Sequence, residues 1–553
     1  MKTVLTSAYD RALKTCRLGS RMEFDFLIIG AGSAGCVVAN RLSANAGFRV
    51  GLLEAGGPDN YPWIHIPVGY FKTMGNPKTD WCYKTEPDPG LNNRSLDWPR
   101  GKTLGGSSSI NGLLYVRGQP QDYNHWRQLG NSGWSWEDVL PLFKRSESWE
   151  GEDDAVRGQD GPLTVSRNRV NRGIVDAWLA AAVAAGHKWT DDYNQEDQEG
   201  VGYFQMTMKG GRRCSSAVAY LNPVKHRKNL TVFTRAHTQK IVIKDGKAVG
   251  AEVWINGDVK TIRARKEVIL CTGAIGSPQL LMLSGIGDGH ELQDHGIETR
   301  YDLPGVGKNL QDHLQARPIY KCNVDTINTE KQNPLRLLGM ALQYATMRSG
   351  PMTMAASLGT GFLKTHPDLE SPDIQYHIQP FSADKVADGA HKFSAFTASV
   401  CQLRPESRGS ISLKSPNSKD YPVIRPNYLS TKTDCDTIVA ALKLTRRICQ
   451  HEPVSSLITE EYEPGVNVDK NDYDSLLNWA REHCTTIYHP VGTCKMGQDA
   501  MAVVDEKLRV HGVGNLRVAD ASIMPTITSG NTNAPSFMIG EKLSDLVLAT
   551  YKK

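Results

Sequence analysis

Residues 24–35, FDFLIIGAGSAG, decide the fold of this chain. An apolar run typical of a buried parallel strand ends in the pattern Gly30-x-Gly32-x-x-Gly35, and residues 36–44, CVVANRLSA, follow with helical spacing. A second apolar segment, residues 48–53, ends at Glu54, about twenty positions after Gly35. The order strand, glycine turn, helix, strand and acid predicts a parallel βαβ unit.

Each glycine of this turn has a physical role. Gly30 permits the tight turn, Gly32 lets the backbone approach a pyrophosphate, and Gly35 lets the helix pack on the strand. The unpaired N–H groups and positive dipole at the helix N-terminus favour phosphate groups. A carboxylate at Glu54 can accept a hydrogen bond from a ribose 2′-OH and would repel a 2′-phosphate, which disfavours NADP. The motif alone leaves NAD and FAD open.

Composition narrows the class of protein. The 553 residues are 40% hydrophobic and 22% charged, which excludes wholesale disorder, collagen and coiled coil. The net charge of +5 is small, and the basic residues are scattered, so we expect no nucleic-acid partner. The 11 cysteines include no CxxC pair, which suits neither a disulfide framework nor a zinc site, and we expect no metal. Residues 1–21 are basic without an apolar segment, so we interpret them as an N-terminal extension rather than a secretory signal.

Further glycine-rich and polar blocks follow along the chain. They are GKTLGGSSSINGLLYVRG (101–118), GAIGSPQLLMLSGIG (273–287), PGVGKNLQDHL (304–314), TIYHPVGTCKMG (486–497) and NLRVADASIMPTITSGNTNAPSFMIGEK (515–542). In this order, the blocks resemble those of the glucose–methanol–choline (GMC) oxidoreductase family from about Glu23 to the C-terminus. The resemblance implies an α/β fold: a Rossmann-like FAD-binding domain with a second, α+β substrate domain built on an antiparallel sheet.

The resemblance also implies how the domains divide the chain. We expect a discontinuous FAD-binding domain formed by residues 22–318 and completed by 484–553. No cofactor motif occurs in residues 319–483, where we place the substrate-binding domain. Asp245-Gly246 and Asn256-Gly257 separate strand-like runs and predict hairpins that lead to the block at 273–287.

The same resemblance, carried over residue by residue, predicts the FAD site. The predicted cofactor-binding residues are Gly30, Gly32, Ser33, Ala34, Gly35, Glu54, Ala55, Arg100, Gly101, Leu104, Gly105, Gly106, Ser109, Asn111, Gly112, Leu113, Thr238, Gly273, Asp520, Ala521, Asn531, Asn533 and Ala534. Family members with covalent flavin can carry a histidine after the glycine–serine run. Ile110 stands there in this chain and has no nucleophilic atom, so we expect non-covalent FAD.

A catalytic pair is expected near the C-terminus. Hydride transfer from an alcohol carbon needs a base for the hydroxyl proton, and a neutral imidazole suits this role. By resemblance, His489 in the YHPVGT segment is the active-site histidine, and the family's spacing to a second His or Asn leads to Asn533. We therefore predict His489 as the base and Asn533 as the donor that orients the substrate oxygen. His489 acting only as a hydrogen-bond partner stays open, and we interpret His483 as structural.

The predicted function is FAD-dependent oxidation of a primary alcohol to its aldehyde, with electrons passed to a quinone-type acceptor. The alternatives are an alcohol oxidase that reduces O2 to H2O2 and a choline dehydrogenase. Choline is disfavoured because a quaternary ammonium cage needs clustered aromatic side chains, and the expected substrate segment has no tryptophan before Trp479. A hydroxynitrile lyase and a fatty-acid photodecarboxylase of the same fold are weaker hypotheses.

The sequence carries fewer signals for the cellular location and assembly than for the cofactor. No stretch approaches the roughly 20 apolar residues of a membrane span. We expect a cytoplasmic enzyme, with peripheral docking at the inner membrane open because a quinone acceptor would favour it. The sequence leaves the oligomeric state undetermined.

Overall fold

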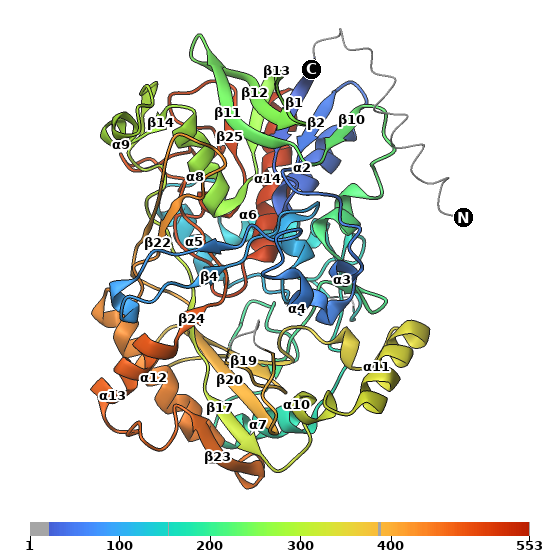
Figure 1. Cartoon of the computed structure of the whole chain (residues 1–553), viewed down its shortest axis with the longest axis vertical. Coiled ribbons are helices and arrows are strands. Elements are labelled where there is room, and N and C mark those ends of the chain that lie inside the picture. The colour runs from blue at the N-terminus through green and yellow to red at the C-terminus, as the bar shows by residue number, and fades with distance from the viewer. Residues whose placement is uncertain (1–21, 153, 385–388, 552–553) are drawn as a thin grey trace.

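The computed structural model describes residues 22–152, 154–384 and 389–551, so the expected N-terminal extension lies outside the described residues. Two large sheets organise the chain, one in the upper half of Figure 1 and one in the lower half. The first is a mainly parallel sheet with a helix-flanked centre, and the second is antiparallel with helices against it. This architecture confirms the predicted α/β plus α+β fold class.

Strand β1 (Glu23–Ile29) lies at the centre of the first sheet and pairs in parallel with both of its neighbours. Phe26, Leu27 and Ile28 are fully buried, since such a strand is covered on both faces. This burial is why residues 24–30 read as one apolar run. Across the sheet, the strands are β10 (Leu230–Phe233), β2 (Val50–Leu53), β1, β13 (Asp258–Leu270), β12 (Lys247–Ile255) and β11 (His237–Lys244), and β25 (Leu516–Val518) also pairs with β13.

The two predicted hairpins join β11, β12 and β13. Asp245 and Gly246 have φ angles of 49° and 75°, and Asn256 and Gly257 have φ angles of 54° and 91°. Two successive positive φ angles define the tight turn that matches the twist of antiparallel strands, and Asn, Asp and Gly tolerate them best. The hairpin prediction is therefore confirmed.

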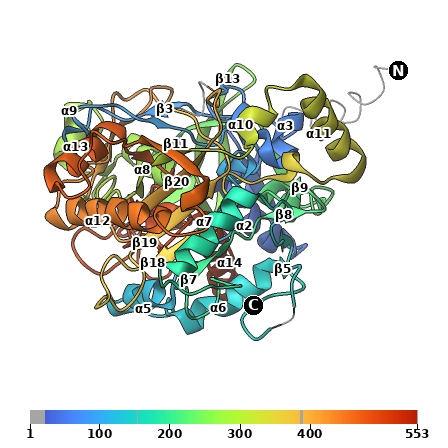
Figure 2. The ribbon, with the colours of Figure 1, turned by 90° about the horizontal axis from the view of Figure 1, so that it is seen from below.

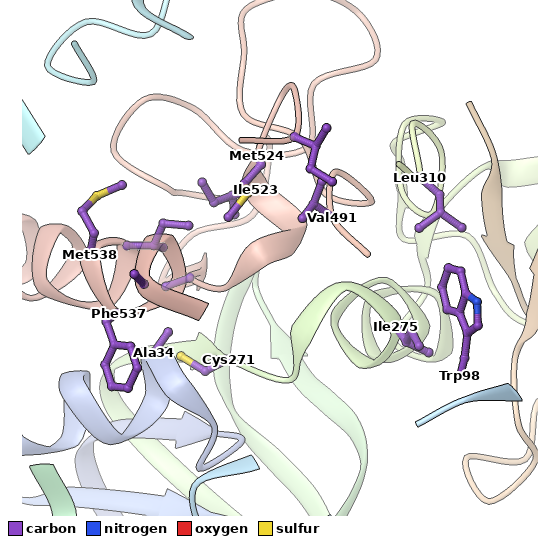
Figure 3. Close-up of a cluster of buried hydrophobic side chains, with 14 of the residues drawn as sticks. Ala34, Trp98, Cys271, Ile275, Leu310, Val491, Ile523, Met524, Phe537 and Met538 are labelled. Atoms are coloured by element: carbon purple, nitrogen blue, oxygen red, sulfur yellow. The ribbon is translucent and has the colours of Figure 1, made fainter. Parts of the chain in front are cut away.

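The C-terminal segment completes the first sheet and covers it. Helix α14 (Asn533–Thr550) packs along α2 (Ser33–Ser43), the helix that follows β1. The approach is close, because a Cβ on Gly540 would lie 2.9 Å from the carbonyl oxygen of Ala34. In Figure 3, side chains from α2, α14 and the end of β13, namely Ala34, Phe537 and Cys271, gather in one apolar cluster.

The second sheet draws on more of the chain than residues 319–483. Its strands are β23 (Ile458–Glu463), β17 (Ile319–Cys322), β20 (Ala395–Gln402), β19 (Ile374–Gln379), β18 (Gly359–Leu363) and β7 (Gly200–Tyr203), with β16 (Leu314–Ala316) joining β20 to β24 (Thr485–Thr486). Thus β7, β16 and β24 come from outside the predicted substrate segment. The domain limits stay a prediction. The sequence pattern of a strand does not show which distant strand pairs with it.

Helices cover the outer face of the second sheet. Seen from below in Figure 2, α7 (Gly173–Ala184) and α12 (Lys432–Cys449) run across it. Buried Trp178 of α7 packs against Tyr376 of β19, with ring centroids 5.1 Å apart. The other long helices are α5 (Pro120–Gln128), α6 (Trp136–Ser146), α8 (Gly273–Leu283), α11 (Pro334–Met347) and α13 (Tyr473–His483). The opposite face of the second sheet is directed toward the first sheet.

Candidate active site

One cavity is lined both by the turn after β1 and by strands of the second sheet. The predicted residues that line it are Gly30, Gly32, Ser33, Ala34, Glu54, Ala55, Arg100, Gly101, Gly106, Asn111, Gly112, Thr238, Gly273, His489, Asp520, Ala521, Asn531 and Asn533. Those outside its lining are Gly35, Leu104, Gly105, Ser109, Leu113 and Ala534. The fold therefore brings together residues that lie up to about 500 positions apart.

The three glycines of the turn after β1 occupy different environments. A Cβ on Gly30, whose φ is 99°, would lie 2.4 Å from the carbonyl oxygen of Cys271, and one on Gly35 would lie 1.9 Å from that of Gly30. A Cβ on Gly32 would meet only the Cys271 carbonyl oxygen, at 4.0 Å. Gly30 and Gly35 thus allow the turn and the helix to close up, while Gly32 faces open space at the N-terminus of α2, as a bound pyrophosphate requires.

Glu54 lies at the end of β2, beside this turn. Its carboxylate accepts hydrogen bonds from the N–H groups of Ala31 at 3.0 Å and Gly56 at 2.8 Å. Burial raises the pKa of Glu54 to about 7, and the two N–H groups oppose that rise. Nearby, the buried hydroxyl of Thr238 lines the cavity and has no hydrogen-bond partner among the described residues. Both side chains therefore retain capacity for a polar ligand.

The glycine–serine loop lies across the start of α2. The N–H of Gly105 donates to the carbonyl oxygen of Ala31 at 2.8 Å, and a Cβ on Gly106 would lie 2.7 Å from the Cα of Gly32. Ser109 is fully buried and donates to the carbonyl oxygen of Leu104 at 2.8 Å. Leu104, Gly105 and Ser109 thus shape the loop from behind.

The side chains of two further predicted residues, Leu113 and Asp520, are buried. Leu113 is fully buried, and its carbonyl oxygen accepts from the N–H of Thr207 at 2.8 Å. The carboxylate of Asp520 accepts from the N–H of Gly273 at 2.9 Å and the hydroxyl of Ser277 at 2.6 Å. Because its side chain is used in this way, Asp520 presents backbone rather than carboxylate to the cavity.

His489 lies in the cavity lining directly after Tyr488, a bulky residue whose φ is 69°. A positive φ at such a residue is costly and is typical of functional sites. The N–H of His489 donates to Asp312 at 2.7 Å, and Asp312 also accepts from the hydroxyls of Thr486 and Tyr428. These contacts fix the backbone that carries the imidazole.

Both ring nitrogens of His489 have partners. Nδ1 lies 3.1 Å from Nδ1 of His313, whose own Nε2 lies 3.0 Å from the carbonyl oxygen of Leu403. Nε2 lies 3.0 Å from the side-chain nitrogen of Asn531, and the carbonyl oxygen of Asn531 accepts from Gln375 at 3.2 Å. The carboxamide facing His489 is thus held at both ends.

Asn533 was predicted to orient the substrate oxygen beside His489, and the structure places Asn531 against His489 instead. The carboxamide oxygen of Asn533 accepts from the hydroxyl of Ser33 at 2.8 Å, which joins the N-termini of α14 and α2. Asn533 is the first residue of α14, so its side chain follows the helix toward the glycine turn, while Asn531 precedes the helix and reaches His489. Spacing along the chain could not separate two asparagines that are two positions apart.

The histidines of this cluster are held neutral. Burial lowers the pKa of His489 well below its usual value, and the nearby His313 and His377 lower it further. Burial likewise lowers the pKa of His313 to about 4 and that of His377 to about 3. A neutral imidazole keeps one lone pair, which is the form that can accept a proton.

The comparison with known families decides the identity of the chain. Residues 24–315 match the GMC oxidoreductase N-terminal model, and residues 405–540 match the C-terminal model. The chain belongs to the GMC oxidoreductase family. It is a flavoprotein oxidoreductase acting on CH–OH donors, with FAD implied as the cofactor. Open space beyond Gly32, the unpartnered Thr238 hydroxyl and the two helix N-termini fit that cofactor.

Curated GMC relatives match nearly the full chain. It is 42% identical over 529 residues to an oxygen-dependent choline dehydrogenase of Brucella anthropi, covering 95% of this chain and 96% of the relative. It is also 42% identical over 534 residues to an alcohol dehydrogenase [acceptor] of Pseudomonas putida, with the same coverage. The two relatives differ in the substrate and acceptor that their names give.

Solved structures show the same architecture. Pyridoxine 4-oxidase from Mesorbium loti has a TM-score of 0.86 and 30% identity, with 96% of this chain and 100% of that chain covered. A formate oxidase variant from Aspergillus oryzae has a TM-score of 0.87 and 26% identity, covering 96% and 98%. The likeness extends over both sheets.

Sequence reasoning missed several residues of the site. Asp312 and His313 belong to the block PGVGKNLQDHL, whose resemblance to the family predicts no role for either side chain. A buried Asp-His pair directly before a strand was the available signal. Gln375 and His377 of β19 carry no motif at all, since strand pairing alone brings Gln375 to Asn531 and His377 to the cavity.

No cluster of three or more His, Cys, Asp or Glu side chains suited to a metal ion occurs within the described residues. In the same part of the chain, no helix combines the length and the apolar character needed to cross a membrane.

Proposed function

We propose that this protein oxidises a primary alcohol to its aldehyde, with His489 as the base and Asn531 orienting the substrate oxygen. The observation that carries the proposal is the contact between Nε2 of His489 and the carboxamide nitrogen of Asn531 inside the cavity. Bound FAD would supply the hydride acceptor, at its N5 atom. An alcohol oxygen between these two side chains can accept from Asn531 while its proton passes to His489.

The hydrogen-bond network favours one tautomer of His489. The carbonyl oxygen of Leu403 can only accept, so His313 carries its proton on Nε2 and offers a lone pair at Nδ1. His489 must then donate from Nδ1, which leaves the lone pair on Nε2 facing Asn531. The tautomer is assigned here from the donors and acceptors around the ring, which is how histidine tautomers are generally assigned. The basic atom therefore points where the substrate hydroxyl is needed.

We also propose that FAD is held without a covalent bond. Ile110 lines the cavity at the position after the glycine–serine run and offers no nucleophile. The glycine turn, Glu54 and the N-termini of α2 and α14 supply the binding groups instead. Acid precipitation should release the flavin into the supernatant, and yellow colour that stays in the pellet would contradict this.

The electron acceptor and location are proposed in the same way. The name of the Pseudomonas putida relative gives an acceptor without specifying it, and we propose a quinone-type acceptor; the Brucella anthropi name supports O2 as the second candidate. A quinone acceptor would bring this protein, which we propose to be cytoplasmic, to the inner-membrane surface. Comparing H2O2 release with reduction of a quinone-like dye, using one alcohol, separates the two acceptors.

The test of the proposed chemistry is anaerobic flavin reduction by alcohols. His489→Ala should slow flavin reduction by about 10²–10⁴-fold, the usual range for one acid/base group, while FAD content persists. His483→Ala is the matched control, because that imidazole is exposed and stacks on Trp479 outside the cavity. A His489→Ala rate close to that of the parent protein would overturn the assignment.

A further inference from the structure

The cavity beyond His489 is formed by alternate residues of two strands. His313, Gln315 and Arg317 are spaced two apart along β16 and its flanks, so they share one face. Gln315 and Arg317 line the cavity, as do His377 and Gln379 of β19. We call the part of the cavity lined by Gln315, Arg317, His377, Gln379, Phe381 and Tyr488 the substrate end.

Arg317 is the unusual member of this set. Its side chain is only partly covered by protein, and neither a salt bridge nor a side-chain hydrogen bond ties it to any residue in 22–152, 154–384 or 389–551. The fully buried arginines Arg117 and Arg157, by contrast, both pair with Glu147, and Arg157 also pairs with Asp192. Burial lowers the pKa of Arg317, yet a guanidinium stays charged at neutral pH.

The acidic side chains near this cavity are engaged elsewhere. Glu54 is bonded to backbone N–H groups beside β2, Asp520 is bonded to backbone at the start of α8, and Asp420 is exposed. Asp384 contributes to the field at Arg317 but forms no salt bridge with it, and its carboxylate lies 3.0 Å from the ring nitrogen of His391. Within the described residues, the substrate end itself contains neutral glutamines, an imidazole and aromatic rings, but no carboxylate.

A second cation lies close to His489. Arg100 lines the same cavity and donates to the carbonyl oxygens of Tyr488 at 2.6 Å and Pro99 at 2.5 Å. Asp312, the acid nearest to His489, is fully committed to three donors, and burial raises its pKa to about 6. Two guanidinium groups, those of Arg100 and Arg317, therefore lie at this cavity against the one carboxylate of Asp312, and this balance favours an anion over a further cation.

We propose that the substrate is an alcohol that carries a carboxylate, and that Arg317 binds this carboxylate while His489 receives the hydroxyl proton. A planar guanidinium matches a carboxylate with two parallel hydrogen bonds, and the pairing also supplies the missing counter-charge. Gln315 and Gln379 also line this end of the cavity, and their carboxamide N–H groups can donate to the carboxylate. This inference rests on the proposed oxidation at His489.

The inference implies that a choline-type substrate, which is a cation, is disfavoured in this cavity. A quaternary ammonium would bring a second positive charge to the side of Arg317, in a cavity that holds no carboxylate at the substrate end of the described residues. The name of the Brucella anthropi relative would then describe a different substrate charge from the one this cavity fits.

The test uses substrates that differ only in charge. Steady-state turnover of the FAD-loaded protein with an artificial electron acceptor is measured with para-(hydroxymethyl)benzoate, para-(hydroxymethyl)benzamide and para-(hydroxymethyl)phenyltrimethylammonium. A second, aliphatic series of γ-hydroxybutyrate, γ-hydroxybutyramide and choline guards against a poor fit of the ring. We expect kcat/KM to fall in the order anion, neutral, cation in at least one series, with about tenfold or more between anion and neutral.

Variants assign the preference to one side chain. Arg317→Met should lower kcat/KM for the anion by about 10–100-fold, change that for the amide by less than about threefold, and raise that for the cation. Arg317→Lys should retain part of the anion preference, because it keeps the charge without the planar fork. Arg263→Met is the matched control, since Arg263 is exposed on β13.

Binding provides a second measurement that does not need turnover. Benzoate, which cannot be oxidised, should perturb the flavin spectrum of the parent protein more strongly than benzamide, and Arg317→Met should abolish the difference. Equal use of anion and amide by the parent protein, unchanged in Arg317→Met, would refute the carboxylate assignment while alcohol oxidation stands. If no alcohol of either series reduced the flavin, the proposed oxidation itself would fail, and the assignment with it.

Discussion

His313→Leu should slow flavin reduction without loss of FAD. Nδ1 of His313 lies 3.1 Å from Nδ1 of His489 and is the acceptor that keeps the His489 proton on that nitrogen. Leucine fills a similar volume but accepts nothing. The buried N–H of His489 then has no partner, and the tautomer with its lone pair on Nε2, which the proposed chemistry needs, becomes less populated.

The magnitude follows from the cost of an unpaired buried donor. That cost is about 1–3 kcal/mol, and His489 is only 7% exposed, so water cannot replace the lost acceptor. If the whole cost falls on the competent tautomer, its population and the rate of flavin reduction drop by about 5–150-fold, at about 1.4 kcal/mol per factor of ten. His313→Asn should stay within about fivefold of the parent rate, because its carboxamide oxygen can accept from Nδ1.

The assay is anaerobic stopped-flow reduction of the flavin by one neutral alcohol at saturating concentration. FAD content from the absorbance of the purified proteins controls for folding and cofactor binding. A His313→Leu rate within about twofold of the parent, at equal FAD content, would refute the role of His313, since the expected loss is at least about fivefold. Equal losses in the Leu and Asn variants would also count against it, since a purely structural effect does not depend on the acceptor.

Three other predictions concern the cofactor, the second asparagine and pH. Gly35→Ala should give protein without FAD, because its Cβ would lie 1.9 Å from the carbonyl oxygen of Gly30, whereas Gly173→Ala, with nothing within 4 Å, should keep the yellow colour. Asn533→Ala should weaken FAD binding in a titration of the apoprotein while Asn531→Ala slows flavin reduction; the reverse pattern would restore the pairing expected from sequence. Burial lowers the pKa of His489, so its imidazole stays neutral at pH values below about 6.5, the usual pKa of histidine. The value of kcat/KM for a neutral alcohol should therefore stay level as the pH falls from about 8 to about 6. A decrease in kcat/KM centred near pH ~6.5 would contradict the lowered pKa.

The glycine turn after β1 was predictable because its determinants are local. Three features require particular residue types at fixed offsets. They are the tight turn with a φ of 99° at Gly30, the helix that packs against that turn, and the acid at the end of the next strand. The hairpins at 245–246 and 256–257 were predictable for the same reason. In these segments, the chain's neighbours in sequence are also its neighbours in space.

The partner of His489 was not predictable in this way. Asn531 and Asn533 belong to the same family block, and the offset from His489 pointed to Asn533, whereas Asn531 contacts His489 in the structure. Which carboxamide faces the imidazole depends on where α14 begins and on two distant contacts. Ser33 lies 500 positions from Asn533, and Gln375 lies 156 positions from Asn531. Such contacts leave no local pattern in the sequence.

By itself, the sequence determined the family, the cofactor class and the histidine that we propose carries the chemistry, because short-range backbone geometry restricts which residues can stand in those motifs. Only the tertiary structure decided that Asn531 faces His489, that Nδ1 of His313 faces Nδ1 of His489, and that Arg317 enters the cavity without a salt bridge to any other described residue. The physical reason is that hydrogen-bond geometry and burial are fixed by the packing of two sheets against each other. A residue's charge is written in the sequence, but whether another charge lies beside it is settled by the fold.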